Sequence, residues 1–206
     1  ANENAITKKT IELYARKHTL DPFEFSLDAS LFCDVIICDY NYLFDPAVYL
    51  QRFFAEADEA NFFLIDEAHN LVSRARDMYS AEIDDAAFTQ LKVALAPFKG
   101  AGLPAIKGNL TKLITAFDVV RLSMDGKREL FRADPVEAFV EALDRLSQSI
   151  HEWLSGELRT DQQAVVDLLL PVYFVCLGFL RIYDFYNDCF ETKLTDDGQK
   201  LTIKEM

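Results

Sequence analysis

The sequence predicts a mostly helical α+β fold, and three features carry this prediction. Two short apolar runs, at residues 34–39 and 61–65, are flanked by charged residues, which is typical of strands buried on both faces of a parallel sheet. Four long segments between residues 84 and 187 space their apolar residues as amphipathic helices do. The last residues alternate apolar and polar side chains around Asp197 and Gly198, which indicates a β-hairpin.

Composition excludes several classes of protein. The chain has 206 residues, of which 50% are hydrophobic, so it can form a core and is not intrinsically disordered. The longest uncharged run, 168–180, is shorter than the roughly 20 residues of a membrane span, and the N-terminus has no apolar signal segment. The net charge of −13 disfavours unspecific nucleic-acid binding. We therefore expect a cytoplasmic protein without a membrane partner.

The N-terminal part of the chain alternates predicted helices and strands. A helix is expected over 3–19 and a short one over 23–31, because Pro22 excludes a helical conformation at Asp21 between them. The first strand, 34–39, is followed by a helix that begins at Pro46. The second strand, 61–65, precedes a helix over 67–79. Because two strands do not make a stable parallel sheet, we expect a piece of a larger α/β sheet here.

The middle of the chain predicts four helices, over 84–98, 103–124, 134–156 and 160–187. Asp134, Pro135 and Glu137 form a typical helix start, with an N-cap, a proline at the first helical position and an acid in the first turn. Aromatic residues are dense in the last of these segments, and we expect them to pack in the core rather than to stack on bases. The hairpin is expected within 189–204.

An acidic pair follows the second predicted strand. Asp66 and Glu67 would lie at the carboxyl end of that strand, where open α/β sheets bind ligands. There Asp66 would orient water around Mg²⁺ and Glu67 would polarise the water that attacks a γ-phosphate. His69 would report the state of the nucleotide to another part of the protein. The alternative is structural: Asp66 caps the following helix and His69 lies on its face.

The surrounding sequence resembles a known helicase family. Residues 34–46 read DVIICDYNYLFDP, residues 64–71 read LIDEAHNL, and residues 75–79 read ARDMY. This combination of an Asn-Tyr segment, an Asp-Pro pair and a DEAH box is similar to the iron–sulfur superfamily 2 DNA helicases of the XPD/DinG type, over residues 5–80. In that family a helical Arch domain is inserted after the DEAH strand and helix, and the order of segments in this chain resembles that plan.

The resemblance implies a fragment of an ATP-dependent DNA helicase that moves 5′-to-3′ on single-stranded DNA, near the bacterial nucleoid and with a role in DNA repair. It assigns 1–83 to part of the first motor domain, 84–188 to the Arch domain and 189–206 to strands that return to the motor domain. It implies that Asp66 is the Mg²⁺-associated acid, Glu67 the catalytic base beside ATP, and His69 the residue that couples hydrolysis to movement. Asn41 and Tyr42 would lie near the motor core without a catalytic role.

Two departures from the family pattern are visible. No G-x-x-x-x-G-K-[ST] loop occurs in the chain, so we expect these residues alone not to hydrolyse ATP and to need the remaining motor domains as partners. The family also binds a 4Fe–4S cluster through four cysteines, and Asp21 stands where the fourth is expected. Because carboxylate oxygen replaces thiolate poorly, we expect no cluster in this chain, while the longer protein remains a candidate to hold one.

The resemblance implies that the helical segment 84–188 is a gate over the groove that passes single-stranded DNA. The basic residues that would contact the DNA are Lys92, Lys99, Lys107, Lys112, Arg121, Lys127, Arg128 and Arg132. Lys127, Arg128 and Arg132 are the only local cluster among them and are the preferred candidates. The alternative for each is a solvated surface charge.

A second function also fits the sequence. The chain would then be a non-enzymatic helical module whose acidic surface binds a partner protein, with the DEAH segment as scaffold. Under the helicase hypothesis, apolar surface left uncovered by the missing motor sheet would favour a non-physiological dimer of the fragment.

Overall fold

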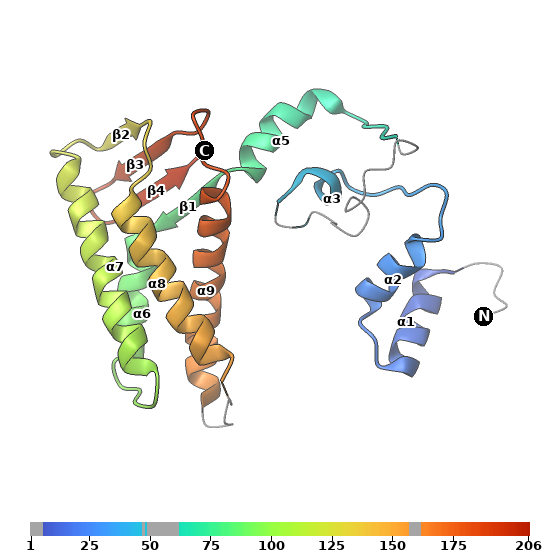
Figure 1. Ribbon diagram of the computed structural model, residues 1–206, viewed down its shortest axis with the longest axis horizontal. Helices are drawn as coiled ribbons and strands as arrows, with labels where there is room; N and C mark the ends of the chain where they lie inside the picture. The colour runs from blue at the N-terminus through green and yellow to red at the C-terminus, as the bar shows by residue number, and fades with distance from the viewer. Residues whose placement is uncertain (1–5, 47, 49–61, 157–161) are drawn as a thin grey trace. The chain divides into compact units, whose positions relative to one another are not determined.

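The computed structural model describes residues 6–46, 48, 62–156 and 162–206 (Figure 1). The chain divides into two compact units, one of residues 1–44 and 48–66 and the other of residues 45–47 and 67–206. Each unit is described by itself. The predicted α+β class, mostly helical, is confirmed, because α-helices dominate the described residues and are accompanied by one antiparallel sheet.

The first unit contains short helices, namely α1 (Lys8–His18), α2 (Pro22–Ser30) and α3 (Asn41–Phe44). α1 and α2 pack against each other and confirm the helices predicted in this region. α1 begins after Thr7, whose Oγ1 accepts a hydrogen bond from Thr10 N at 3.3 Å. It ends at Thr19, which has the left-handed conformation with φ of 55° that often closes a helix.

The two strands predicted in the first unit are not formed, so that prediction is wrong. Residues 34–39 and 62–65 have no regular secondary structure, and Ile37 and Leu64 are 95% and 90% exposed. A strand is stable only when its backbone pairs with another strand, and the described residues of this unit contain none. The apolar side chains of both runs therefore remain uncovered. The helix predicted after Pro46 lies outside the described residues.

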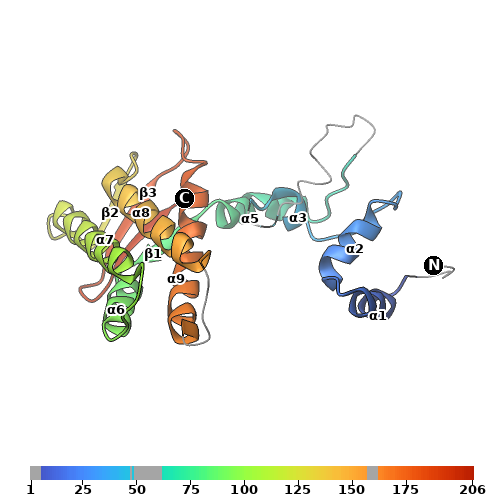
Figure 2. The same ribbon diagram turned by 60° about the horizontal axis from the view of Figure 1, so that its bottom comes forward.

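The second unit contains a helical bundle and one sheet. Its described helices are η1 (Ala68–Asn70), α5 (Leu71–Met78), α6 (Asp85–Leu95), α7 (Leu103–Ser123), α8 (Glu137–Leu154) and α9 (Gln163–Tyr183). Its described strands are β1 (Ala81–Asp84), β2 (Glu129–Arg132), β3 (Thr192–Asp196) and β4 (Leu201–Glu205). Helices α6 to α9 run alternately in opposite directions beside the sheet (Figures 1 and 2). The four predicted helices and the C-terminal hairpin are confirmed.

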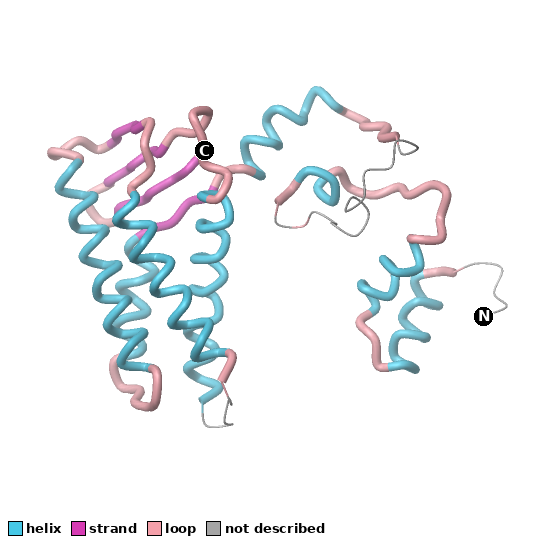
Figure 3. Tube along the Cα trace, in the orientation of Figure 1, coloured by secondary structure: helices cyan, strands magenta, loops and turns pink. Residues whose placement is uncertain are grey.

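The sheet joins segments that are far apart in the sequence. Its strand order is β1-β4-β3-β2, and every neighbouring pair is antiparallel. The strands are the magenta segments of Figure 3. The hairpin of β3 and β4 is thus extended on both sides by strands that the sequence did not predict. β1 lies mostly in the connection predicted between the helices over 67–79 and 84–98, and β2 in a region predicted as a loop. Each has only four residues, too few for an alternating pattern to be recognised.

The start of α8 differs from the prediction. The helix begins at Glu137, its N-cap position is Val136, and no side chain caps it, so the N-cap predicted at Asp134 is wrong. The connection from β2 to α8 is held outside the helix because Tyr186 Oη donates a hydrogen bond to the carbonyl oxygen of Ala133 at 3.0 Å. A tertiary contact therefore overrides a favourable local helix signal.

One apolar core links the helices to one face of the sheet. A row of aromatic rings crosses it, in which Phe117 contacts Phe88 and Phe139, and Phe139 contacts Phe179, with centroids 4.7–5.8 Å apart. The sheet contributes inward side chains to the same core, among them Leu194, which lies opposite Ile203. This continuous core explains why the second unit folds into a compact body.

α9 is the most apolar helix of the described chain. By length and composition it could cross a membrane, with a mean hydropathy of 2.1 over its most apolar window, of which 28% is buried. In the structure it packs against α6, α8 and β1. A core helix meets the same criterion, so the composition of α9 alone does not indicate a membrane segment.

Candidate nucleotide and nucleic-acid sites

The DEAH segment forms a turn that leads into a short helix. Asp66 and Glu67 lie in the turn, and Glu67 has left-handed backbone torsions, φ 52° and ψ 36°. η1 begins at the next residue, and α5 follows without a break. All residues from 66 to 69 are exposed. The acidic pair therefore precedes the first helical residue instead of lying within a helix, although the strand predicted before it is absent.

Glu67 and His69 interact directly. Glu67 Oε2 lies 3.2 Å from His69 Nε2, and the two side chains are 64% and 74% exposed. Glu67 holds the N-cap position of η1, but its side chain makes no capping hydrogen bond. The residue at the N-cap position is therefore Glu67 and not Asp66. The Glu67 carboxylate thus faces solvent beside an imidazole.

The donor atoms of this segment suit magnesium. Carboxylate oxygens are hard ligands, and Mg²⁺ commonly binds through one or two carboxylates while water and substrate phosphates complete its coordination. Within the described residues, no group of three or more His, Cys, Asp or Glu side chains is arranged to hold a metal ion. A Mg²⁺ ion at Asp66 would therefore take most of its ligands from water and phosphate.

Asp21 has a structural role that does not fit an iron–sulfur cluster. Its Oδ1 accepts hydrogen bonds from Phe23 N and Glu24 N, each at 2.9 Å, and Pro22 occupies the first position of α2. The carboxylate is thus the N-cap of α2, and its oxygens are hard donors. The four cysteines form no disulfide, and Cys33, Cys38 and Cys189 are exposed while Cys176 is buried. Burial raises the pKa of the Cys176 thiol to about 12, which keeps it protonated.

The Asn-Tyr segment forms α3 and is held within the first unit. Asn41 N donates a hydrogen bond to Asp39 Oδ1 at 2.9 Å, which starts the helical turn. The ring of Tyr42 stacks on that of Phe23 of α2, with centroids 6.3 Å apart. Both contacts serve local structure, and neither gives Asn41 or Tyr42 a chemical role.

The predicted DNA-contact cluster lies at one edge of the sheet. Lys127 and Arg128 are exposed in the turn between α7 and β2, and Arg132 ends β2, which is an edge strand. Side chains alternate along a strand, so Arg132 lies on the face opposite to that of Phe131. The structure brings Lys127 and Arg128 together, but it places Arg132 at the other end of the strand.

Two other predicted contact residues serve the fold. Lys107 Nζ donates hydrogen bonds to the carbonyl oxygens of Ala96 and Phe98, at 3.2 and 2.7 Å, and so closes the end of α6. Arg121 donates to Asp85 Oδ2 at 2.7 Å and to Asp196 Oδ2 at 2.9 Å, which ties α7 to α6 and β3. These internal bonds leave neither cation as a simple surface charge.

The outer face of the sheet carries basic and aromatic residues that sequence reasoning missed. Strand register places Lys204 opposite Lys193, and Lys193 opposite Phe131, across β4, β3 and β2. Phe131 is 50% exposed, and Lys193 Nζ lies 5.3 Å from the centroid of its ring while pairing with Glu129. A cation beside an exposed ring is an arrangement that binds single-stranded nucleic acid. The row unites three separate strands, so only their pairing reveals it.

Comparison with known proteins found a family match for the N-terminal part of the chain. Residues 1–88 match the model of the family described as DEAD_2. A comparison with curated proteins found no match. The matched residues include the Asn-Tyr segment, the DEAH turn, α5 and β1, and the match ends within α6. This part of the chain is therefore related to the DEAD/DEAH-box helicases, which hydrolyse nucleotides.

Proposed function

We propose that the chain is part of an ATP-dependent DNA helicase of the iron–sulfur superfamily 2 type, which couples ATP hydrolysis to 5′-to-3′ movement on single-stranded DNA. The observation that carries the proposal is the exposed Asp66–His69 turn inside the segment that matches the helicase family model. The resemblance of the flanking segments to the XPD/DinG type supports the finer assignment.

Each residue of the turn has a role in this proposal. Asp66 would hold Mg²⁺ through water, and the ion would supply charge neutralisation at the phosphates of the nucleotide. Glu67 accepts a proton from the water that attacks the γ-phosphate. His69, paired with Glu67 at 3.2 Å, senses whether that carboxylate is engaged and passes the change on through η1 and α5. The exposure of the turn leaves its carboxylates accessible to a nucleotide held by other parts of a longer protein.

The uncovered apolar runs support a larger motor domain. Three consecutive large side chains of the run before the DEAH turn are strongly exposed: Phe62 at 82%, Phe63 at 54% and Leu64 at 90%. Such a run is costly in water and is typical of a strand that other strands cover. We propose that remaining motor domains supply those strands, together with the phosphate-binding loop that this chain lacks.

The proposed path for DNA follows the outer face and edge of the sheet. Lys193, Lys204 and Phe131 form a row across the strands, and Lys127 and Arg128 lie in the turn that precedes β2. The lysines would contact phosphates and the Phe131 ring would stack on a base. The row supplies local cations in a chain whose net charge is −13, and the strand register places Glu82 beside it, opposite Lys204.

The direct test replaces the proposed base in the longer protein that contains these residues. Glu67→Gln keeps the size of the side chain but removes its basicity, so DNA-stimulated ATP hydrolysis should fall by a factor of about 10²–10⁴ while Mg²⁺-ATP still binds. The matched control is Glu191→Gln, an exposed glutamate before β3 that lies outside both the turn and the proposed DNA path, which should leave the rate unchanged. Near-normal turnover of the Glu67→Gln protein would remove Glu67 from its role.

A further inference from the structure

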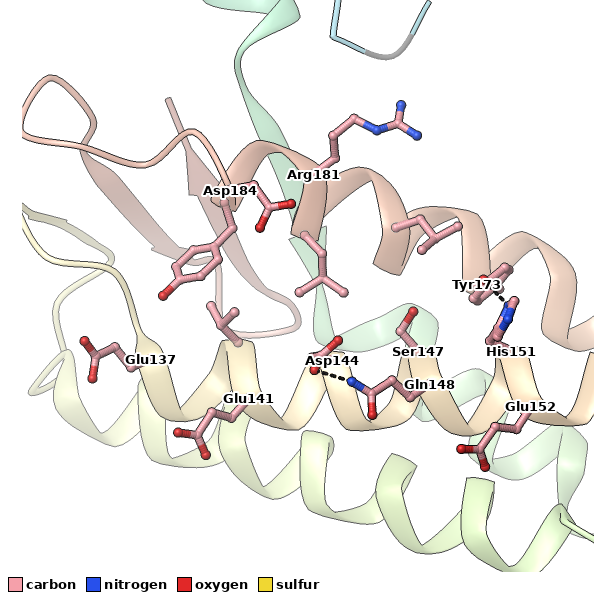
Figure 4. A pocket seen from close by; sticks show the side chains of 14 residues that line it. Glu137, Glu141, Asp144, Ser147, Gln148, His151, Glu152, Tyr173, Arg181 and Asp184 are labelled. Atoms are coloured by element: carbon pink, nitrogen blue, oxygen red, sulfur yellow. Dashed lines mark hydrogen bonds between the residues drawn. The ribbon is translucent and has the colours of Figure 1, made fainter.

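A long groove lies between α8 and α9 of the second unit (Figure 4). Its volume is about 1010 Å³, and the apolar part of its lining includes Val140, Leu177 and Leu180. Tyr173 and Tyr183 add aromatic surface from α9. Toward the end of α8, His151 Nδ1 and Tyr173 Oη form a hydrogen bond of 2.9 Å that links the two helices. The groove thus has an apolar lining between two helices that are tied to each other.

Carboxylates dominate the polar part of this lining. The lining contains one guanidinium, that of Arg181, which points away from α8 in Figure 4, and five carboxylates, those of Glu137, Glu141, Asp144, Glu152 and Asp184. The α8 carboxylates recur at spacings of three, four and eight residues, so they follow one side of that helix, as Figure 4 shows. The partners of two of them are local and on α8 itself, since Glu141 pairs with Arg145 at 3.4 Å and Asp144 accepts from Gln148 at 2.6 Å.

This charge pattern selects the kind of partner. A row of carboxylates repels phosphate, so the groove is unsuited to DNA, in contrast to the outer face of the sheet. An apolar lining with an acidic border is complementary to a segment with an apolar stripe flanked by Lys and Arg. The partner is therefore a protein segment, and its basic residues set the specificity.

The shape of the groove indicates the conformation of the partner segment. From Glu137 to Glu152 the border follows α8 for about 22 Å, at 1.5 Å per residue. A helix of about 15 residues matches that length, and the space beside two packed helices accepts a third by ridges-into-grooves packing. We infer that the α8–α9 groove is the docking site for a basic amphipathic helix of a partner protein. This inference does not depend on the proposed helicase function.

The test uses the chain and a defined probe. The probe is a fluorescent synthetic helix of about 15 residues with a leucine stripe flanked by lysines, and its twin carries glutamate at every lysine position. Fluorescence anisotropy should give binding of the lysine peptide that weakens at least about tenfold in the double variant Glu141→Lys with Asp144→Lys. The glutamate twin should not bind.

The matched control separates docking from general attraction to an acidic protein. Asp188→Lys with Glu191→Lys changes the net charge by the same amount at exposed positions outside the groove, and it should weaken binding less than about twofold. Equal weakening by both double variants would overturn the inference, as would binding of the glutamate twin. Single-stranded DNA that competes with the lysine peptide for the unchanged chain would also overturn it, because DNA would then occupy this face. Circular dichroism of each variant verifies that it is folded.

Discussion

The two units of this chain differ in how completely they cover their apolar residues. The second unit buries large aromatic side chains such as Phe88, Phe117 and Phe139 in one continuous core. In the first unit, Ala15 is the only described residue that is buried, while Ile37 and Leu64 are almost fully exposed. The DEAH turn spans the boundary of the two units, since Asp66 ends the first and Glu67 and His69 belong to the second, and the apolar run directly before it is left uncovered. The comparison teaches that a sequence motif can be recognised even where the apolar segment that precedes it is not covered by other residues.

The largest expected effect tests the core of the second unit. Phe139 is 1% exposed and contacts Phe117 and Phe179, so Phe139→Ala should lower the free energy of unfolding by about 3–5 kcal/mol. Urea denaturation followed by circular dichroism measures this change. Phe174→Ala is the matched control, since Phe174 is 61% exposed and its removal should change stability by less than about 0.5 kcal/mol. Equal effects of the two changes would contradict the continuous core.

A smaller effect depends on pH and on a buried acid at the end of β4. Glu205 is 1% exposed, its Oε2 has no hydrogen-bond partner among the described residues, and burial raises its pKa to about 7. Between its unfolded pKa of 4.5 and about 7, the folded state holds a proton that the unfolded state has lost, so stability falls as the pH rises through this window.

Glu205→Gln removes this titration. It should raise the free energy of unfolding at about pH 8 by about 1–2 kcal/mol and flatten the decline between about pH 5 and 7. Glu129→Gln is the control, because Glu129 is 49% exposed and should leave the pH profile intact. If the free energy of unfolding of Glu205→Gln still declined as before over this pH range, other titrating groups would be the cause.

The smallest effect on stability is expected in the first unit. Ile37→Ser and Leu64→Ser replace side chains that make little buried contact, so together they should change the free energy of unfolding by less than about 0.5 kcal/mol. They should lower self-association, measured by sedimentation velocity, because uncovered apolar side chains attract each other. Ile203→Ser, at a core position of β4, provides the contrast and should destabilise clearly. Strong destabilisation by the first two changes would mean that these runs are covered.

Much of the second unit could be predicted from local sequence, and the rest depends on pairing. The helices of this unit follow from apolar spacing that persists over many residues, and the hairpin from its Asp-Gly turn. β1 and β2 could not be predicted, because four-residue strands exist only through their partners in β4 and β3. The basic row of Lys193 and Lys204 with Phe131 was missed for the same reason. The position of a strand within a sheet cannot be predicted from the residues of that strand alone.

The strands predicted at 34–39 and 61–65 show the opposite case. Their apolar composition is that of buried strands. A strand also requires neighbouring strands for its backbone hydrogen bonds, and composition does not show whether the chain contains them. The DEAH turn could be recognised by its residues, whereas the left-handed backbone of Glu67 and its contact with His69 could not. The sequence shows that Asp21 stands where a cluster cysteine is expected, but not that its carboxylate is the N-cap of α2.

Hydrogen exchange is the most direct test of whether residues 62–65, before the DEAH turn, are uncovered or are covered by other strands. The central claim is that residues 62–65 form a covered strand only when the remaining motor domains are present. In the 206-residue chain their amides should exchange without protection, while amides of α7 and α8 are strongly protected. In the longer protein the same amides should become protected by a factor of at least about 100. Equal, unprotected exchange of residues 62–65 in both proteins would contradict the claim.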